Sequence, residues 1–318
     1  MALWQESMIR LARSERVTAF AHRQPWLRGL AGRFVGGSTV GEAGAEAARL
    51  AERGIASSVF YLGEYETDPA VIAATIDQLG LAIDDCAARG LDVCASVDPT
   101  QIGLMDNQSV FAVNATTLAR RVAAAAKTPR FGHDVLMIDM EDSGVTDATL
   151  SVYWALRAAS LPVAVTIQAY LHRTPSDLGK LVKSGGWVRL VKGALAERRN
   201  VAVRSRTARD SRYRKCVSLL LGATARETGV YPAFATHDAN LIGEIITQAN
   251  ANGWDKDKYE FEMLYGVRPD LQQALVARGY RVRVYLPFGR DWFPYAIRRV
   301  GESPRNLRFV AKTILPSR

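Results

Sequence analysis

The chain has 318 residues, of which 48% are hydrophobic and 23% are charged, and its formal net charge at pH 7 is +9. This composition is typical of a globular protein with a large core, and it excludes a disordered chain, a collagen and a coiled coil. The apolar runs are short and interrupted by charges, so we expect no helix with the ~20 apolar residues that cross a membrane.

The three cysteines, Cys86, Cys94 and Cys216, form no Cys-x-x-Cys pair. An odd number without such a pair favours buried thiols in a cytoplasmic protein.

The first 50 residues predict a helical arm that packs on the main body. Between Met8 and Phe20, apolar residues recur at helical spacing with arginines between them. A basic membrane-surface helix and a targeting sequence are the alternatives, and the acidic Glu6 and Glu15 weaken the second. Peripheral association with the inner face of the membrane therefore stays open. Residues 51–318 contain no linker-like segment, so we assign them to one catalytic domain.

Short apolar runs alternate with longer helical patterns along the rest of the chain. The predicted strands are Ser57–Leu62, Leu91–Val97, Asp134–Met140, Leu161–Gln168, Trp187–Val191, Tyr231–Thr236, Tyr259–Leu264 and Arg281–Leu286. Amphipathic helices are predicted over Pro69–Arg89 and Asn107–Ala126, and this alternation is typical of parallel βαβ units. Eight repeats in about 260 residues favour a closed (β/α)8 barrel over an open sheet.

Polar residues recur where the predicted strands end, which in such a barrel is the face that carries the chemistry. They are Glu64, Asp98, Asp139, Glu141, Gln168, Lys192, Thr236, His237 and Asp238, with Leu264, Tyr265 and Tyr285 at the last two strands. Each one alone could be a helix cap or a satisfied buried group. Their convergence on one ring predicts an active site there.

A segment rich in arginine and aromatic residues follows the eighth predicted strand. Asp291 or the turn after it can open a helix, with Pro294 tolerated in the first turn. The side chains that share one face of this helix are Tyr295, Arg298, Arg299 and Glu302. Paired arginines can bind a carboxylate bidentately, and a solvated charged face is the alternative.

Several common catalytic signatures are missing from the sequence. No G-x-G-x-x-G follows the first predicted strand, and neither a P-loop nor a G-x-S-x-G elbow occurs. The histidines are scattered without the spacing of metal ligands. We therefore expect no Rossmann nucleotide site, no ATPase site and no metal centre.

Between Ser57 and Asn306, the sequence resembles the proline dehydrogenase family. The motifs that carry the resemblance are YLGE (61–64), IDMEDS (138–143), TIQAYL (166–171), VRLVKGA (188–194), FATHD (234–238), YEFEMLYGV (259–267) and YLPFGRDWFPYAIRR (285–299). The resemblance implies a flavin-binding (β/α)8 barrel whose last helix lies over the barrel mouth. It also implies FAD-dependent oxidation of proline, or of a proline-like cyclic secondary amine, to the imine by hydride transfer to flavin N5. The electron acceptor would be a quinone or oxygen.

The resemblance further implies roles for individual residues. Arg298 and Arg299 would bind the substrate carboxylate and Glu302 would orient them, while Glu64 would pair with a helix arginine. Tyr285, Tyr295 and Leu264 would pack around the pyrrolidine ring, with Asp139 at the edge of the active site. The residues implied to hold FAD are Gln168, beside the flavin ring, and Arg189, Val191, Lys192, Gly193, Ala194, Thr236 and His237.

One position departs from the family pattern. The family usually carries a lysine that helps to bind the substrate carboxylate at the end of the second strand, and SVDPTQIG (96–103) places Asp98 there. Two like unit charges ~4 Å apart repel each other by about 4 kcal/mol at an effective dielectric near 20, so a carboxylate at this position would weaken binding of the substrate carboxylate. Asp98 therefore raises two alternatives: an enzyme that acts on a modified proline or another amine, and a non-catalytic flavin- or ligand-binding protein.

A basic segment covers residues 197–216. Its eight arginine and lysine side chains and two acidic ones give a net charge of +6. It carries no nucleic-acid motif, so no nucleic-acid partner is expected. A solvated face and attraction to the cofactor or to an anionic membrane are the remaining interpretations.

Overall fold

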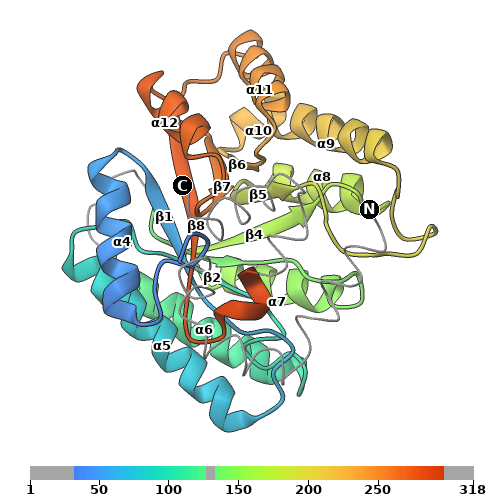
Figure 1. The fold of residues 1–318 in the computed structure, drawn as a ribbon. Helices are drawn as coiled ribbons and strands as arrows, with labels where there is room; N and C mark the ends of the chain where they lie inside the picture. Colours follow the sequence, from blue (N-terminus) through green and yellow to red (C-terminus); the bar gives the residue numbers. More distant parts are fainter. Residues whose placement is uncertain (1–31, 127–132, 297–318) are drawn as a thin grey trace, which may run out of the picture.

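The computed structural model describes residues 32–126 and 133–296. Eight parallel strands follow one another in sequence order, and the first pairs with the last, so the sheet closes into a barrel. The helices lie outside the ring of strands (Figure 1). The predicted (β/α)8 fold is confirmed.

All eight predicted strands are present, with small differences at their ends. Their bounds are β1 Ala56–Tyr61, β2 Cys94–Val97, β3 Val135–Ile138, β4 Val163–Gln168, β5 Trp187–Val191, β6 Tyr231–Ala235, β7 Glu260–Leu264 and β8 Arg281–Phe288. β2 begins later than predicted because the Val93 N–H donates to the Asp134 carboxylate (2.6 Å) and not to a neighbouring strand. β8 extends to Phe288, which pairs with Tyr61.

The helices form the outer layer. Their bounds are α4 Val40–Glu52, α5 Pro69–Ala88, α6 Gln108–Ala125, α7 Thr146–Ala158, α8 Thr174–Ser184, α9 Arg206–Leu220, α10 Ala223–Glu227, α11 Ala239–Ala251 and α12 Pro269–Ala277. Residues 292–296 are also helical, directly after Asp291 as predicted. Side-chain caps start several helices; Asp238, for example, accepts the N–H groups of Asn240 and Leu241 at the start of α11.

The apolar core lies between the strands and the helices, since parallel strands are buried on both faces. Inside the barrel, apolar residues fill the lower part: Cys94, Val135, Met137, Ala164, Trp187, Tyr231 and Ala233. Four charged side chains are also buried in the barrel interior: Arg189, Glu260, Glu262 and Arg283. Glu260 and Arg283 contact Tyr231 and Trp187 in this lower part, whereas Arg189 and Glu262 lie nearer the strand ends, where Arg189 reaches Asp139.

The N-terminal region is described only from residue 32 onward, so most of the predicted arm, including Met8–Phe20, lies outside the described residues. α4 packs on α5, β1 and β8. Just before it, the Gly36 N–H donates to the Pro287 carbonyl (2.8 Å), which attaches this segment to the end of β8. In the described part of the chain, we find no helix with the length and apolar character required to cross a membrane.

Candidate active site

Arg189 is the centre of the polar network inside the barrel. β5 points this side chain inward, where only 3% of it is exposed. Its Nε donates to Glu262 of β7, and its Nη1 donates to Asp139 after β3 (2.7 Å) and to Ser96 of β2 (3.1 Å). Burial alone would lower the pKa of Arg189, but the Glu262 and Asp139 carboxylates outweigh it and raise the pKa. The guanidinium is thus a fixed cation.

Tyr285 of β8 covers this guanidinium. The Arg189 Cζ atom lies 5.4 Å from the centre of the Tyr285 ring, within the range of a cation–π contact. The ring also packs against Phe60, with 5.2 Å between centroids. Burial, with the charges of Asp139 and Asp98, holds the pKa of Tyr285 well above its usual range, so the phenol stays protonated.

Besides Glu262 Oε1, three polar atoms of this network have no hydrogen-bond partner among the described residues. Arg189 Nη2, Asp139 Oδ2 and Gln168 Oε1 are buried and unpaired. Other atoms of the same side chains are fixed: Thr166 donates to Asp139 (2.7 Å), and Gln168 Nε2 donates to the Met140 carbonyl (3.1 Å). Buried polar groups are normally paired, so one free donor and two free acceptors together indicate a polar ligand.

The ends of β5 and β6 bring together most of the other predicted cofactor residues. Lys192 contacts Asp210 (2.8 Å) and Asp238 (3.6 Å), and the Leu264 N–H donates to His237 Nε2 (3.0 Å). The Thr236 hydroxyl accepts the Asp238 N–H (3.2 Å). Of the three remaining residues, Val191 ends β5, Ala194 is exposed in the loop that follows it, and Gly193 lies between them.

Gly193 has a backbone angle φ of +93°, and a Cβ atom there would overlap the ring of Tyr170. Gly193→Ala should therefore combine backbone strain with a clash, while Gly229→Ala (φ +72°, open space) carries only the strain. We expect the clash to lower the free energy of unfolding by a further ~1–3 kcal/mol, as overpacking does. Urea unfolding of both variants measures this difference. Equal losses would show that Tyr170 moves aside freely.

The ends of β1, β2 and β3 form an acidic side of the mouth. The charges of Glu64, Asp98, Glu141 and Asp142 all act on Tyr65. Glu141 is buried and accepts the N–H (2.8 Å) and the hydroxyl of Thr100. Burial, reinforced by Glu64 and Asp142, raises the pKa of Glu141 to about 7 despite these hydrogen bonds. Asp98 is half-buried and Glu64 is exposed.

Tyr295 is buried with Trp292 and Phe293 in a cluster that includes Phe34 and Phe60. Tyr285 packs on the same cluster, so two of the predicted substrate-binding tyrosines lie near each other. Arg298, Arg299 and Glu302 lie outside the described residues.

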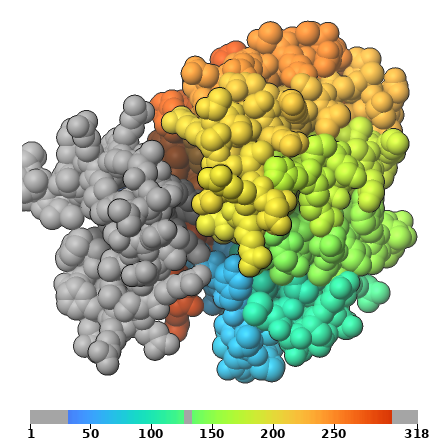
Figure 2. Space-filling model, turned by 90° about the vertical axis from the view of Figure 1, so that its right-hand side faces the viewer, coloured from blue at the N-terminus to red at the C-terminus, as the bar shows by residue number. Residues whose placement is uncertain are grey.

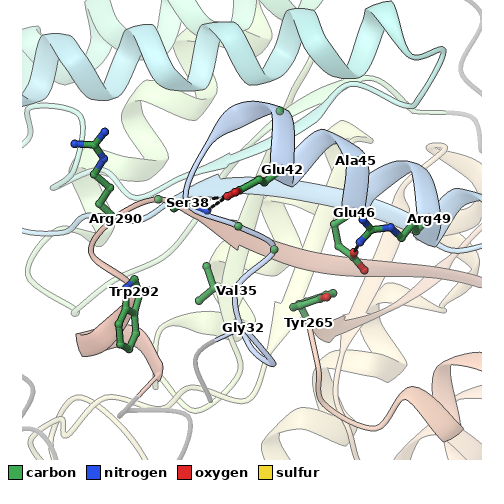
Figure 3. A pocket seen from close by; sticks show the side chains of 14 residues that line it. Gly32, Val35, Ser38, Glu42, Ala45, Glu46, Arg49, Tyr265, Arg290 and Trp292 are labelled. Carbon is green, nitrogen blue, oxygen red and sulfur yellow. Dashed lines mark hydrogen bonds and ion pairs between the residues drawn. The ribbon is translucent and has the colours of Figure 1, made fainter. Parts of the chain in front are cut away.

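A cavity of about 840 Å³ lies apart from this network, between α4 and the segments that follow β7 and β8. Figure 3 shows Glu42 and Ser38 on one side of it and Arg290 and Trp292 on the other. Of the residues predicted at the strand ends, only Tyr265 is among those that line this cavity.

The basic segment lies on the surface. Figure 2 shows the yellow part of the chain that contains it at the front of the molecule. Arg198, Arg199, Arg204 and Arg206 are exposed. Arg214 is paired with Glu244 (2.6 Å), so part of the positive charge is compensated locally.

Sequence reasoning missed the acidic partners inside the barrel. Glu260 and Glu262 are part of the YEFEMLYGV motif, but neither was assigned to the site. Arg283 of β8, which pairs with Glu260 (2.8 Å), was missed as well. The sequence does carry a signal for these residues. Side chains along a strand alternate between the two faces of the sheet, so the charged residues at alternate positions of β7 and of β8 must share one face.

Comparisons with known proteins agree with this arrangement. A family model described as Proline dehydrogenase matches residues 43–312. The chain is 35% identical to a proline dehydrogenase of Deinococcus radiodurans over 98% of both chains. It is 34% identical to proline dehydrogenase 1 of Bacillus subtilis, over 96% of this chain and 97% of that protein.

Among solved structures, proline utilization A (PutA) from Bdellovibrio bacteriovorus, inactivated by N-propargylglycine, has the same fold. Its TM-score is 0.76 at 22% identity, and the match covers 86% of this chain but 32% of that chain. The chain therefore belongs to the proline dehydrogenase family and is an oxidoreductase acting on a CH–NH bond.

Proposed function

We propose that this protein oxidises proline to pyrroline-5-carboxylate with FAD as its cofactor. The observation that carries the proposal is the set of unpaired buried atoms at the strand ends, Arg189 Nη2, Asp139 Oδ2 and Gln168 Oε1. An isoalloxazine ring offers acceptors in its carbonyl oxygens and ring nitrogens and a donor in its N3–H. The free donor of Arg189 and the free acceptor of Gln168 therefore fit the edge of this ring.

When bound, FAD would supply the hydride acceptor of the reaction. The contribution of the chain is to hold positive charge and to orient the substrate. Glu262 of β7, Ser96 of β2 and Asp139 directly after β3 fix the Arg189 guanidinium, so it needs no reorganisation during turnover. The remaining predicted cofactor residues, at the ends of β5 and β6, would hold the rest of FAD.

The substrate would lie beneath the aromatic side chains of the mouth. Tyr285, Tyr295 and Leu264 would pack around the pyrrolidine ring and exclude water, and Asp139 would lie at its edge. Arg298 and Arg299, with Glu302 and Glu64 as their acidic partners, would bind the carboxylate. The protonated amine must lose its proton before hydride can leave the adjacent carbon, because only then is the nitrogen lone pair available.

Reoxidation would require an electron acceptor, for which a quinone and oxygen are the two candidates. The exposed arginines at 198, 199, 204 and 206 support a peripheral contact with an anionic membrane, where a quinone would be available. Turnover with a soluble quinone and with oxygen, each with and without anionic vesicles, distinguishes these routes. Rates that do not depend on the vesicles would argue against the membrane contact.

A substrate panel tests the reaction. Proline, N-methylproline and pyrrolidine are supplied to the FAD-loaded protein, and the products are identified by NMR. We expect pyrroline-5-carboxylate from proline with the highest kcat/KM of the three. A higher kcat/KM for N-methylproline or pyrrolidine would support the alternative that Asp98 has shifted the substrate preference, and turnover of none would support a binding protein.

A further inference from the structure

Two carboxyl groups lie one above the other on β7 and face the barrel interior. Glu260 and Glu262 are 2% and 3% exposed, and each carboxyl group acts directly on the other. Two ionised carboxylates repel each other, and carboxylates only accept hydrogen bonds, so the buried pair is stable when one of the two carries a proton. Glu262 Oε1 finds no N–H or O–H donor among the described residues, which leaves the neighbouring carboxyl as its partner.

The two carboxyl groups have unequal surroundings. Glu260 accepts from Arg283 Nε (2.8 Å) and from the Tyr231 hydroxyl (3.2 Å). Among the described residues, Glu262 has only Arg189 as a cationic hydrogen-bond partner, and Arg189 also donates to Asp139. The proton therefore belongs on Glu262. The charged and titratable groups that face Glu262 are Arg189 from β5, Arg283 from β8, Glu260, Cys94 from β2 and Tyr213 from α9.

We propose that Glu262 is a positioning residue that shares one proton with Glu260 and so controls how much of the positive charge of Arg189 is felt at the barrel mouth. When Glu262 is neutral, Arg189 is compensated by Asp139 alone. When Glu262 ionises, a second anion is in contact with the guanidinium. The coupling of Glu262 to the cofactor, through Arg189, rests on the proposed function.

The protonation equilibrium supports this arrangement. Burial raises the pKa of Glu262 to about 7, and the charge of Glu260 adds to the effect, although Arg189 and Arg283 oppose it. Burial would also raise the pKa of Glu260, but Arg283 and the hydrogen bonds outweigh it and lower the pKa. The proton on Glu262 is therefore lost close to neutral pH.

The first test is the pH dependence of unfolding. The folded chain keeps a proton on Glu262 that the unfolded chain has released above its ordinary pKa near 4.5. Folding stability of the wild type should therefore fall as pH rises toward 7. Glu262→Gln keeps the shape of the side chain and cannot ionise. The urea midpoint of this variant, relative to that of the wild type, should therefore rise between pH 5.5 and pH 8. Glu244 is an exposed partner of Arg214, and the control variant Glu244→Gln should show no such rise in urea midpoint relative to the wild type. Parallel curves for Glu262→Gln and wild type would overturn the shared proton.

The second test is the midpoint potential of bound FAD. Positive charge near a flavin favours its reduced, anionic form. We expect equal potentials for wild type and Glu262→Gln at pH 5.5 and a lower potential for wild type at pH 8. Equal potentials at both pH values would overturn the coupling to Arg189. A protein that binds no FAD would overturn the proposed function instead, and unfolding would still decide whether the proton is shared.

A third readout does not need the Glu262→Gln variant to fold. In a Glu141→Gln background, which removes the other carboxyl with a pKa of about 7, the infrared band of a protonated carboxyl should be present at pH 6 and lost at pH 8. A spectrum without that band at pH 6 would contradict the shared proton.

Discussion

Replacing Arg189 with methionine is expected to lower the free energy of unfolding by about 3–5 kcal/mol, the usual cost of leaving buried charges without their partner. Glu262, Asp139 and Ser96 would each lose one hydrogen-bond donor in a region where Arg189 is only 3% exposed. Urea unfolding of the purified chain measures the loss. The variant should also fail to retain FAD, because the free donor at Nη2 disappears.

Arg214→Met is the matched control. Arg214 also forms an ion pair, with Glu244, but both side chains are about half exposed (50% and 48%). Exposed pairs contribute little to stability, because solvent screens the attraction between the two charges. If the two variants lost the same stability, the interior network would not be the rigid frame of the site.

Replacing Asp98 with asparagine is expected to lower KM for proline by about ten- to a hundredfold with a smaller change in kcat. Asp98 acts electrostatically on both Tyr285 and Tyr65, which places its charge at the mouth of the barrel. The repulsion of a carboxylate ~4 Å away is at most about 4 kcal/mol at an effective dielectric of 20, and solvent reduces it. A change mainly in KM indicates an interaction present in both the ground and the transition state.

Two controls separate this charge effect from a general one. Pyrrolidine has an ammonium group and no carboxylate, so its KM should rise in Asp98→Asn, because attraction to Asp98 is lost. Asp106→Asn removes an exposed charge from the loop before α6 and should leave both KM values unchanged. An unchanged KM for proline in Asp98→Asn would show that this carboxylate does not face the substrate.

The fold could be predicted from the sequence because most strands are short apolar runs that alternate with helical patterns. Parallel strands covered by helices must be apolar on both faces, and eight of them in one domain favour closure. The ends of the strands were less certain. At β2, the bond from Val93 to Asp134 replaces a ladder hydrogen bond, and no local pattern encodes a partner 41 residues away.

The candidate site was predicted less completely than the fold. The strand-end rule located Asp139, Gln168, Lys192, Thr236 and His237, because their positions depend only on where a strand stops. A charged residue within a strand ordinarily argues against burial. Glu260, Glu262 and Arg283 were therefore missed, and Arg189 was implied only by the family resemblance. Their burial is possible only because the closed barrel brings opposite charges from β5, β7 and β8 into contact, and this pairing depends on the register between strands.

Anaerobic titration of the FAD-loaded protein with proline tests the central claim, that the polar end of the barrel presents a flavin to a cyclic amino acid, most directly. We predict that the oxidised flavin absorbance bleaches as proline is added and that one equivalent of pyrroline-5-carboxylate forms per flavin reduced. A protein that takes up FAD and keeps its full absorbance at saturating proline would contradict the account.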